Sequence, residues 1–166
     1  MGVEWVNKAS VPELRNFLRQ CCACEIWIHR MVTGRPYKSL DAVLKAADVN
    51  WRRLDESDYL QAFEGHPMIG DIHSLPTKYA DTRVLAAEEQ SRANTAHHET
   101  LEALAAANVE YKTRFGFVFI VCAKGKSSRE ILALLLARLG NTRDEEIHNA
   151  AQEQCKITRF RLEKLV

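Results

Sequence analysis

No apolar run in this chain reaches the ~18–20 residues that a helix needs to cross a bilayer, so the sequence predicts no membrane span. An excess of one charge is also lacking, since 23 basic and 22 acidic residues leave a formal net charge of +1. Neither nucleic acid nor an anionic membrane surface is therefore an expected partner. What remains is an ordinary globular composition of 166 residues, 46% hydrophobic and 27% charged, which suits one domain with one core.

A disulfide framework is lacking too, because the five cysteines are an odd number without a disulfide-like pattern. No signal peptide is recognisable before them, so a reducing, cytoplasmic location is expected. Cys21, Cys22 and Cys24 form a CCxC cluster instead of the CxxC spacing usual for zinc, and the helical pattern around them turns Cys21 toward the core. We therefore predict no metal site.

Helix-start signals are frequent along the chain. Capping boxes, in which a side-chain oxygen and a glutamate three residues later satisfy backbone amides, occur at Ser10–Glu13, Ser127–Glu130 and Thr142–Glu145. Ser39 and Asp55 are two further N-cap candidates. Apolar residues recur at helical spacing behind each of these positions, which predicts five separate helices.

The middle of the chain is predicted to hold two more helices and one extended segment. One helix covers 83–93, and the next begins at Asn94 or Thr95 and closes at Gly116. The apolar run FVFIVCA at 117–123 breaks the helical period and favours an extended backbone. Since one strand cannot make a sheet alone, the expected fold class is all-α, a single multi-helix domain over 1–166 with one short extended segment.

Most catalytic motifs are lacking: HEXXH, HxH, GxSxG, a phosphate-binding loop and a dinucleotide fingerprint are all absent. His66 is distinctive for its setting, FEGHPMIGD, directly after a predicted helix end. Pro67 restricts the backbone of His66 to extended geometry, so a rigid turn fixes where the imidazole points. A general acid or base requires such placement, although a stiff turn with an incidental histidine also fits and is the more common case.

Two further candidates lie on predicted helices. Glu89 and Gln90 place a carboxylate beside an amide that both donates and accepts hydrogen bonds, although a solvated acidic face has the same pattern. Arg161 carries a guanidinium fork that suits a carboxylate, although a surface arginine looks the same in sequence. Neither residue type identifies a reaction by itself.

Four segments resemble, in order and at suitable spacing, the 2-oxo-4-hydroxy-4-carboxy-5-ureidoimidazoline (OHCU) decarboxylases of purine catabolism. They are GHPMIGD, EEQS, EYKTRFGFVFIVCAKGKS and ITRFRL. The resemblance implies an all-helical single domain, commonly a homodimer, without metal or organic cofactor. It also implies decarboxylation of OHCU to (S)-allantoin in urate degradation.

The resemblance also assigns roles to individual residues. It makes His66 the general acid, with Pro67 lining the site, and Glu89 the essential carboxylate. It makes Gln90 a substrate-binding amide and Arg161 an assistant at the substrate carboxylate. These roles turn weak separate signals into one expected catalytic set.

The substrate-binding set implied by the resemblance has two further parts. Ala86 replaces a serine of the family, and the lost hydroxyl contact is expected to cost about 1 kcal/mol of binding. Backbone groups of the extended segment are expected to bind the substrate ring and ureido tail. The residues concerned are Phe119, Ile120, Val121, Cys122 and Ala123.

Two alternatives remain open. One is a non-catalytic helical module that binds a purine-derived ureide, which the replacement at Ala86 favours. The other is a helical interaction protein without a ligand. The decarboxylase hypothesis additionally predicts a small-molecule substrate, a homodimer, and a hydroxyisourate hydrolase as functional neighbour.

Overall fold

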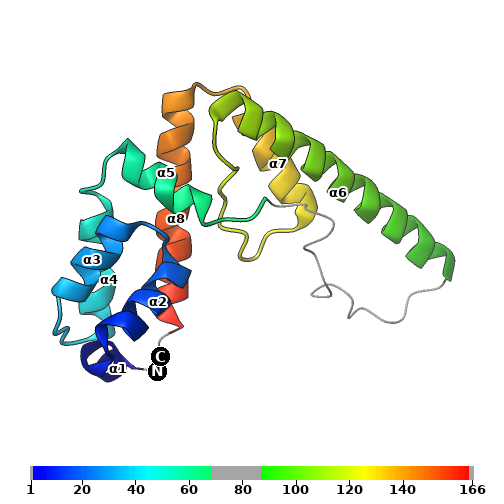
Figure 1. The fold of residues 1–166 in the computed structure, drawn as a ribbon. Coiled ribbons are helices and arrows are strands. Elements are labelled where there is room, and N and C mark those ends of the chain that lie inside the picture. Colours follow the sequence, from blue (N-terminus) through cyan, green and yellow to red (C-terminus); the bar gives the residue numbers. More distant parts are fainter. Residues whose placement is uncertain (1, 69–86, 165–166) are drawn as a thin grey trace. The chain divides into compact units, whose positions relative to one another are not determined.

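The structure, a computed structural model, describes residues 2–68 and 87–164, with side chains from residue 98 onward in the second range (Figure 1). The described residues form helices and connecting segments without a strand, which confirms the predicted all-α class. The helices are α1 (Val3–Lys8), α2 (Val11–Cys21), α3 (Glu25–Thr33), α4 (Leu40–Trp51), α5 (Glu56–Glu64), α6 (Ala87–Phe115), α7 (Ser128–Arg138) and α8 (Arg143–Glu163).

The helices belong to two compact units. Unit 1 consists of Met1–His66, Ile120–Cys122 and Asp144–Val166, and therefore contains α1 to α5 and α8. Unit 2 consists of Pro67–Phe119 and Ala123–Arg143, and contains α6 and α7. A single domain over 1–166 stays a prediction.

Local sequence signals explain where the helices of unit 1 begin. Ser10 and Asp55 each accept a hydrogen bond from the backbone three residues later, and both predicted starts are complete capping boxes. The Ser39 hydroxyl accepts from the backbone of Ala42 at 3.2 Å, as its N-cap assignment predicted. Helices α1 and α3 were not predicted from the sequence, because neither has a side-chain N-cap.

The core of unit 1 contains two tryptophans whose polar atoms are satisfied. Trp27 is fully buried on α3, and its indole N–H donates to the Ala47 carbonyl of the neighbouring α4 at 3.1 Å. Trp51, on α4, donates to the Ala151 carbonyl of α8 at 3.0 Å. Each ring buries a large apolar area without losing a hydrogen bond, so both bind α4 to its neighbours.

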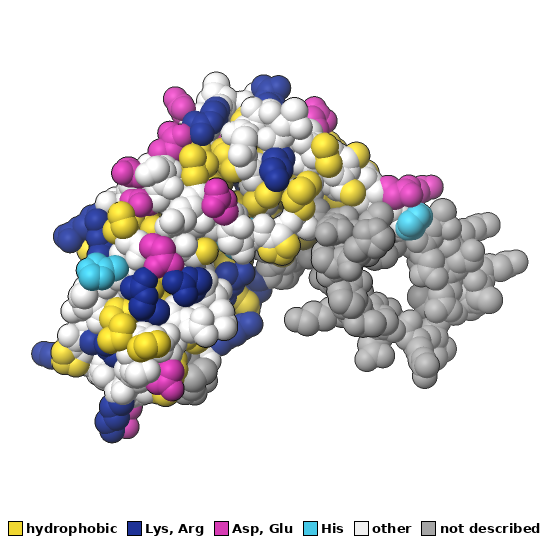
Figure 2. Space-filling view, viewed as in Figure 1, with side chains coloured by type: hydrophobic (Ala, Val, Ile, Leu, Met, Phe, Trp, Pro, Cys, Tyr) yellow, Lys and Arg dark blue, Asp and Glu magenta, His cyan; other side chains and the backbone are white. Residues whose placement is uncertain are grey.

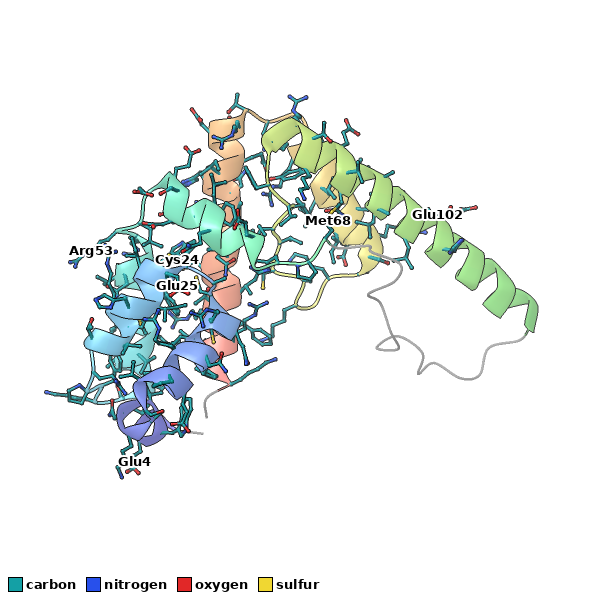
Figure 3. The ribbon with its side chains drawn as sticks, in the orientation of Figure 1. Glu4, Cys24, Glu25, Arg53, Met68 and Glu102 are labelled. Atoms are coloured by element: carbon teal, nitrogen blue, oxygen red, sulfur yellow. The ribbon has the colours of Figure 1, made fainter. Side chains whose placement is uncertain are left out.

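Charged and polar side chains connect α2, α3 and α5. Glu25, at the start of α3 beside Cys24 (Figure 3), accepts hydrogen bonds from Arg15 and Arg19 of α2. The backbone N–H of Glu25 donates to the side-chain carbonyl of Gln61 on α5 at 2.8 Å. The start of α3 therefore fixes α5 against α2, just before the turn that carries the candidate histidine.

Unit 2 differs from the sequence prediction in one respect, because α6 is a single helix from Ala87 to Phe115. The predicted break at Asn94 or Thr95 is wrong. Both residue types favour N-caps but are only mildly unfavourable inside a helix, so they do not require a break. The predicted end at Gly116 is confirmed, and this glycine has a φ of 84° that disfavours other residues.

The core of unit 2 is aromatic. Tyr111 is fully buried, and its ring centroid lies 4.6 Å from that of Phe115 and 5.3 Å from that of Phe119. Arg138 of α7 donates to the Tyr111 hydroxyl at 3.3 Å and lies over the Phe119 ring. These contacts pack α7 along α6 and hold the segment that follows α6.

The described surface carries both charges. On the face shown in Figure 2, basic and acidic side chains are interspersed, as the near-neutral composition predicts. None of the described helices is both long and apolar enough to cross a membrane.

Gly65 allows close packing between the end of α5 and the α2–α3 connection. A Cβ at position 65 would lie only 2.6 Å from the Cβ of Ala23. We expect Gly65→Ala to lower the free energy of unfolding by about 1–3 kcal/mol through this overpacking, as measured by urea denaturation. Gly140→Ala is the control, because a Cβ at position 140 would lie 3.8 Å from the nearest heavy atom, the Ala137 carbonyl oxygen. Full stability of Gly65→Ala, or no recovery when Ala23→Gly is added, would contradict the explanation.

Candidate functional site

The backbone of His66 is held by the end of α5. After Glu64 the chain tightens, with Gly65 N–H donating to the Ala62 carbonyl at 3.3 Å and His66 N–H donating to the Phe63 carbonyl at 3.1 Å. Two successive i→i+3 bonds make a compact turn. The histidine thus follows a helix end, as the sequence predicted, and its backbone is fixed relative to α5.

The imidazole of His66 contacts Gln154, a residue that the sequence analysis did not single out. Its Nε2 lies 2.5 Å from Oε1 of Gln154, a fully buried residue of α8 that is 88 positions away in the chain. The Gln154 amide nitrogen donates to the Thr158 hydroxyl at 3.0 Å. The sequence signal for this contact was a glutamine among the apolar residues of the last helix, because a buried amide requires hydrogen-bond partners.

Burial keeps His66 in its neutral form. Desolvation is the main cause that lowers the pKa of His66, and the positive charge of Arg161 lowers it further. The hydrogen bond with Gln154 opposes this shift only in part. A neutral imidazole has one bare nitrogen, so the side chain is prepared to accept a proton.

Arg161, further along α8 than Gln154, is held in place by hydrogen bonds to the end of α2. Its Nη1 donates to the Gln20 carbonyl at 2.8 Å and to the Cys21 carbonyl at 3.2 Å, both at the C-terminal end of α2. A cation is favourable there because the helix dipole is negative at that end. The structure therefore brings His66 and Arg161, two residues of the expected catalytic set, to one side of α8 within unit 1.

The extended segment is buried and partly hydrogen-bonded within the protein. Ile120 and Val121 are buried, and the Cys122 N–H donates to Oε2 of Glu153 on α8 at 2.7 Å. This N–H therefore has an acceptor on α8, and the substrate-binding role expected for backbone groups of the segment stays a prediction. Phe119, in unit 2, is buried against Tyr111. Ala123, also in unit 2, is exposed, and its carbonyl accepts from Lys126 N–H.

The remaining expected site residues are described less fully. Glu89 and Gln90 lie on α6, but their side chains are outside the described atoms. Ala86 lies outside the described residues altogether. Pro67 is exposed at the start of unit 2. The roles assigned to these four residues stay predictions.

The three clustered cysteines lie in the core of unit 1. Cys21, Cys22 and Cys24 are all buried, and not Cys21 alone. Desolvation raises the pKa of Cys21 to about 11 and that of Cys22 to about 12, so both thiols are protonated. Among the described residues, no three His, Cys, Asp or Glu side chains are placed to hold a metal ion.

Unit 1 also has a surface hollow of about 300 Å³ that lies apart from His66. Helices α4, α5 and α8 contribute its walls, and neither Gln154 nor Arg161 lines it. The lining residues are Trp51, Arg52, Tyr59, Asp144, Ile147, His148, Ala151, Gln152 and Cys155.

Comparison with known proteins identifies relatives along nearly the whole chain. Residues 7–163 match the family model described as OHCU decarboxylase. The chain is 38% identical over 146 residues to the uric acid degradation bifunctional protein TTL of Arabidopsis thaliana, which covers 87% of this chain. It is 26% identical to the OHCU decarboxylase of Halalkalicoccus jeotgali, over 99% of this chain and 92% of that protein.

A solved structure is similar as well. The crystal structure of an OHCU decarboxylase in the presence of (S)-allantoin superposes with a TM-score of 0.71 at 31% identity, covering 99% of this chain and 98% of that one. By contrast, this chain spans only 45% of the Arabidopsis protein and 32% of the bifunctional protein PucL of Bacillus subtilis.

The lowered pKa of His66 has a consequence for stability. In the unfolded chain the imidazole titrates near pH 6.5, whereas the folded chain binds this proton only at lower pH. Its stabilising effect is therefore complete above about pH 6.5 and is lost as the pH falls through the folded pKa. We expect urea denaturation to show a steeper loss of stability on acidification in the wild type than in His66→Gln. The slopes of the free energy of unfolding against pH should differ between the two proteins by at most about 1.4 kcal/mol per pH unit.

His29→Gln controls for the removal of a histidine as such, because His29 is exposed on α3. Parallel pH dependences of the wild type and His66→Gln would contradict the assigned neutral state.

Proposed function

The chain belongs to the OHCU decarboxylase family, and from this premise we propose that it converts OHCU to (S)-allantoin and CO2 in urate degradation. The observation that carries the proposal is the presence together, within unit 1, of a partly buried neutral imidazole and an anchored guanidinium whose charge acts on it. The first group suits proton transfer and the second suits a substrate carboxylate. The similar crystal structure, an OHCU decarboxylase in the presence of (S)-allantoin, supports the choice of product class.

The substrate itself supplies the electron sink for this reaction. Its carboxylate is attached to a carbon beside a ring C=N bond, and loss of CO2 leaves an electron pair on that carbon. The pair forms a C=C bond to the neighbouring ring carbon while the C=N π pair moves onto nitrogen. That nitrogen takes up one proton from water, and an enol remains. We therefore expect no organic cofactor, because the usual reason for one is to accept these electrons.

The enol must then become a ketone by moving one proton from oxygen to the adjacent ring carbon. A neutral His66 can take the hydroxyl proton and return it to that carbon, so the imidazole is first a base and then the acid. Delivery to one face sets the (S) configuration. The lowered pKa of His66 suits this cycle, since the residue must begin without the second proton.

The other proposed roles concern binding. Arg161 would bind the substrate carboxylate before CO2 leaves, with the part of the fork that does not contact α2. Glu89 is proposed as the carboxylate that hydrogen-bonds the hydroxyl or ureido groups, and Gln90 as a substrate-binding amide. Pro67 and backbone groups of the extended segment complete the proposed lining.

Partners are proposed on the same basis. The substrate is a small molecule, and we propose a homodimer and a hydroxyisourate hydrolase as functional neighbour. The relatives named bifunctional uric acid degradation proteins are more than twice as long as the region they share with this chain. Such fusions support a chain that acts beside another enzyme of urate degradation.

The activity is tested with OHCU generated freshly by enzymatic oxidation of urate and hydrolysis of the product. The wild type is expected to accelerate decay of OHCU to optically active allantoin, followed by ultraviolet absorbance and circular dichroism. His66→Ala should lower kcat/KM about 10²–10⁴-fold, the usual contribution of a general acid–base group. His29→Ala, an exposed histidine of the same unit, is the control.

Decay at the spontaneous rate to racemic product, from a folded wild type, would overturn the decarboxylase. Saturable binding of allantoin without turnover would then favour a non-catalytic ureide-binding module.

Arg161→Gln tests the proposed carboxylate contact. Loss of one charge-assisted hydrogen bond costs about 1.5–3 kcal/mol, so we expect kcat/KM to fall roughly 10–100-fold. Arg159→Gln is the matched control, because Arg159 is exposed on the same helix and pairs with Asp48 and Glu163. Equal effects of the two substitutions would show that activity depends on the positive charge of α8 in general and would contradict a specific contact of Arg161 with the substrate.

A further inference from the structure

We propose that Gln154 is a positioning residue that holds His66 in the Nε2–H tautomer, which leaves Nδ1 as the nitrogen that exchanges the proton with substrate. The assignment of the tautomer follows from a chain of hydrogen bonds in unit 1. Only its catalytic consequence depends on the proposed decarboxylation.

The chain of hydrogen bonds begins at a group that can only accept. The backbone carbonyl of Cys21 lies 3.5 Å from the Thr158 hydroxyl, and it also accepts from Arg161. The Thr158 hydroxyl also has a hydrogen bond with the Cys22 side chain, so we infer that its one hydrogen points toward Cys21 and Cys22 and away from Gln154. Its oxygen remains as the acceptor for the Gln154 side chain.

The direction of the next bond fixes the Gln154 amide. Its nitrogen faces the Thr158 oxygen at 3.0 Å, so its oxygen faces His66. The flipped amide would place its oxygen against the Thr158 oxygen, whose hydrogen is already committed, and two acceptors would meet. Because Gln154 is fully buried and Thr158 is 5% exposed, water is a poor substitute partner for either group.

The imidazole nitrogen that meets Gln154 Oε1 must carry a hydrogen, since an amide oxygen cannot donate. Nε2 of His66 is therefore protonated in both charge states, and only Nδ1 gains or loses a proton. Proton exchange at Nδ1 leaves the contact with Gln154 intact throughout a catalytic cycle. This separation of tasks is what a positioning residue provides.

A second histidine–glutamine pair on α8 offers an internal comparison. Gln152 Nε2 lies 2.7 Å from Nε2 of His148, but both side chains are exposed. Water competes for each of their polar atoms, so this pair imposes no single tautomer. Gln152→Leu is thus a matched control for Gln154→Leu on the same helix.

The first measurement uses the substrate-free protein. Long-range ¹H–¹⁵N correlation spectra of ¹⁵N-labelled protein, at a pH where the ring is neutral, separate protonated from bare imidazole nitrogens. We expect the Nε2–H tautomer alone for His66 in the wild type and a mixture in Gln154→Leu. Thr158→Val should release the amide and also give a mixture, whereas Thr158→Ser keeps the hydroxyl and should retain the wild-type tautomer.

The second measurement is the pH dependence of kcat/KM. Gln154→Leu is expected to lower kcat about tenfold with little change in KM, the size of a lost buried hydrogen bond. Gln154→Glu keeps an acceptor but adds a negative charge, so it should retain the tautomer and shift the acid limb of the profile to higher pH. Loss of packing alone would not produce that shift.

The proposal is overturned by an Nδ1–H tautomer in the wild type, or by a Gln154→Leu protein with unchanged tautomer and pH profile. Urea denaturation confirms that each variant is folded, and Thr158→Ser against Thr158→Val decides the case if Gln154→Leu is not. An inactive wild type with the expected tautomer would overturn the proposed function and leave the positioning of His66 standing.

Discussion

Helix α8 buries polar side chains in unit 1, and each must find a hydrogen-bond partner there because an unpaired buried polar group is costly. Gln154 is bonded on both sides, to His66 and to Thr158, and Thr158 is bonded in turn to the end of α2. Arg161 reaches the same helix end one turn later. The need to satisfy one face of α8 thus determines where α2 and the end of α5 lie.

That constraint links folding to the proposed chemistry. The imidazole of His66 is placed by its backbone turn, by Gly65 against Ala23, and by a buried amide. Its neutral state is the result of desolvation, so the burial that stabilises unit 1 also prepares the base. Proximity and orientation are then achieved before substrate arrives, which lowers the entropic part of a reaction barrier.

Local sequence patterns predicted much of this architecture, because capping is decided within four residues. Ser10 and Ser127 start helices as their predicted capping boxes require, and Asp55 starts one as a predicted N-cap. The partner of His66 was not predictable in this way, since Gln154 is 88 residues distant. The engagement of the Cys122 N–H by α8 is also a tertiary contact, and a sequence pattern indicates only that the segment is extended.

The same reasoning explains why so few special residues are needed. If the substrate accepts its own electrons, the protein must supply only a proton shuttle, a cation and a fixed geometry. A histidine on a loose loop would meet the chemical requirement but not the geometric one, because misplacement by about 1 Å can cost roughly 10²-fold in rate. A buried glutamine contributes no chemistry of its own. In unit 1 its hydrogen bond with His66 allows the rigid helix α8 to fix the orientation of one imidazole ring.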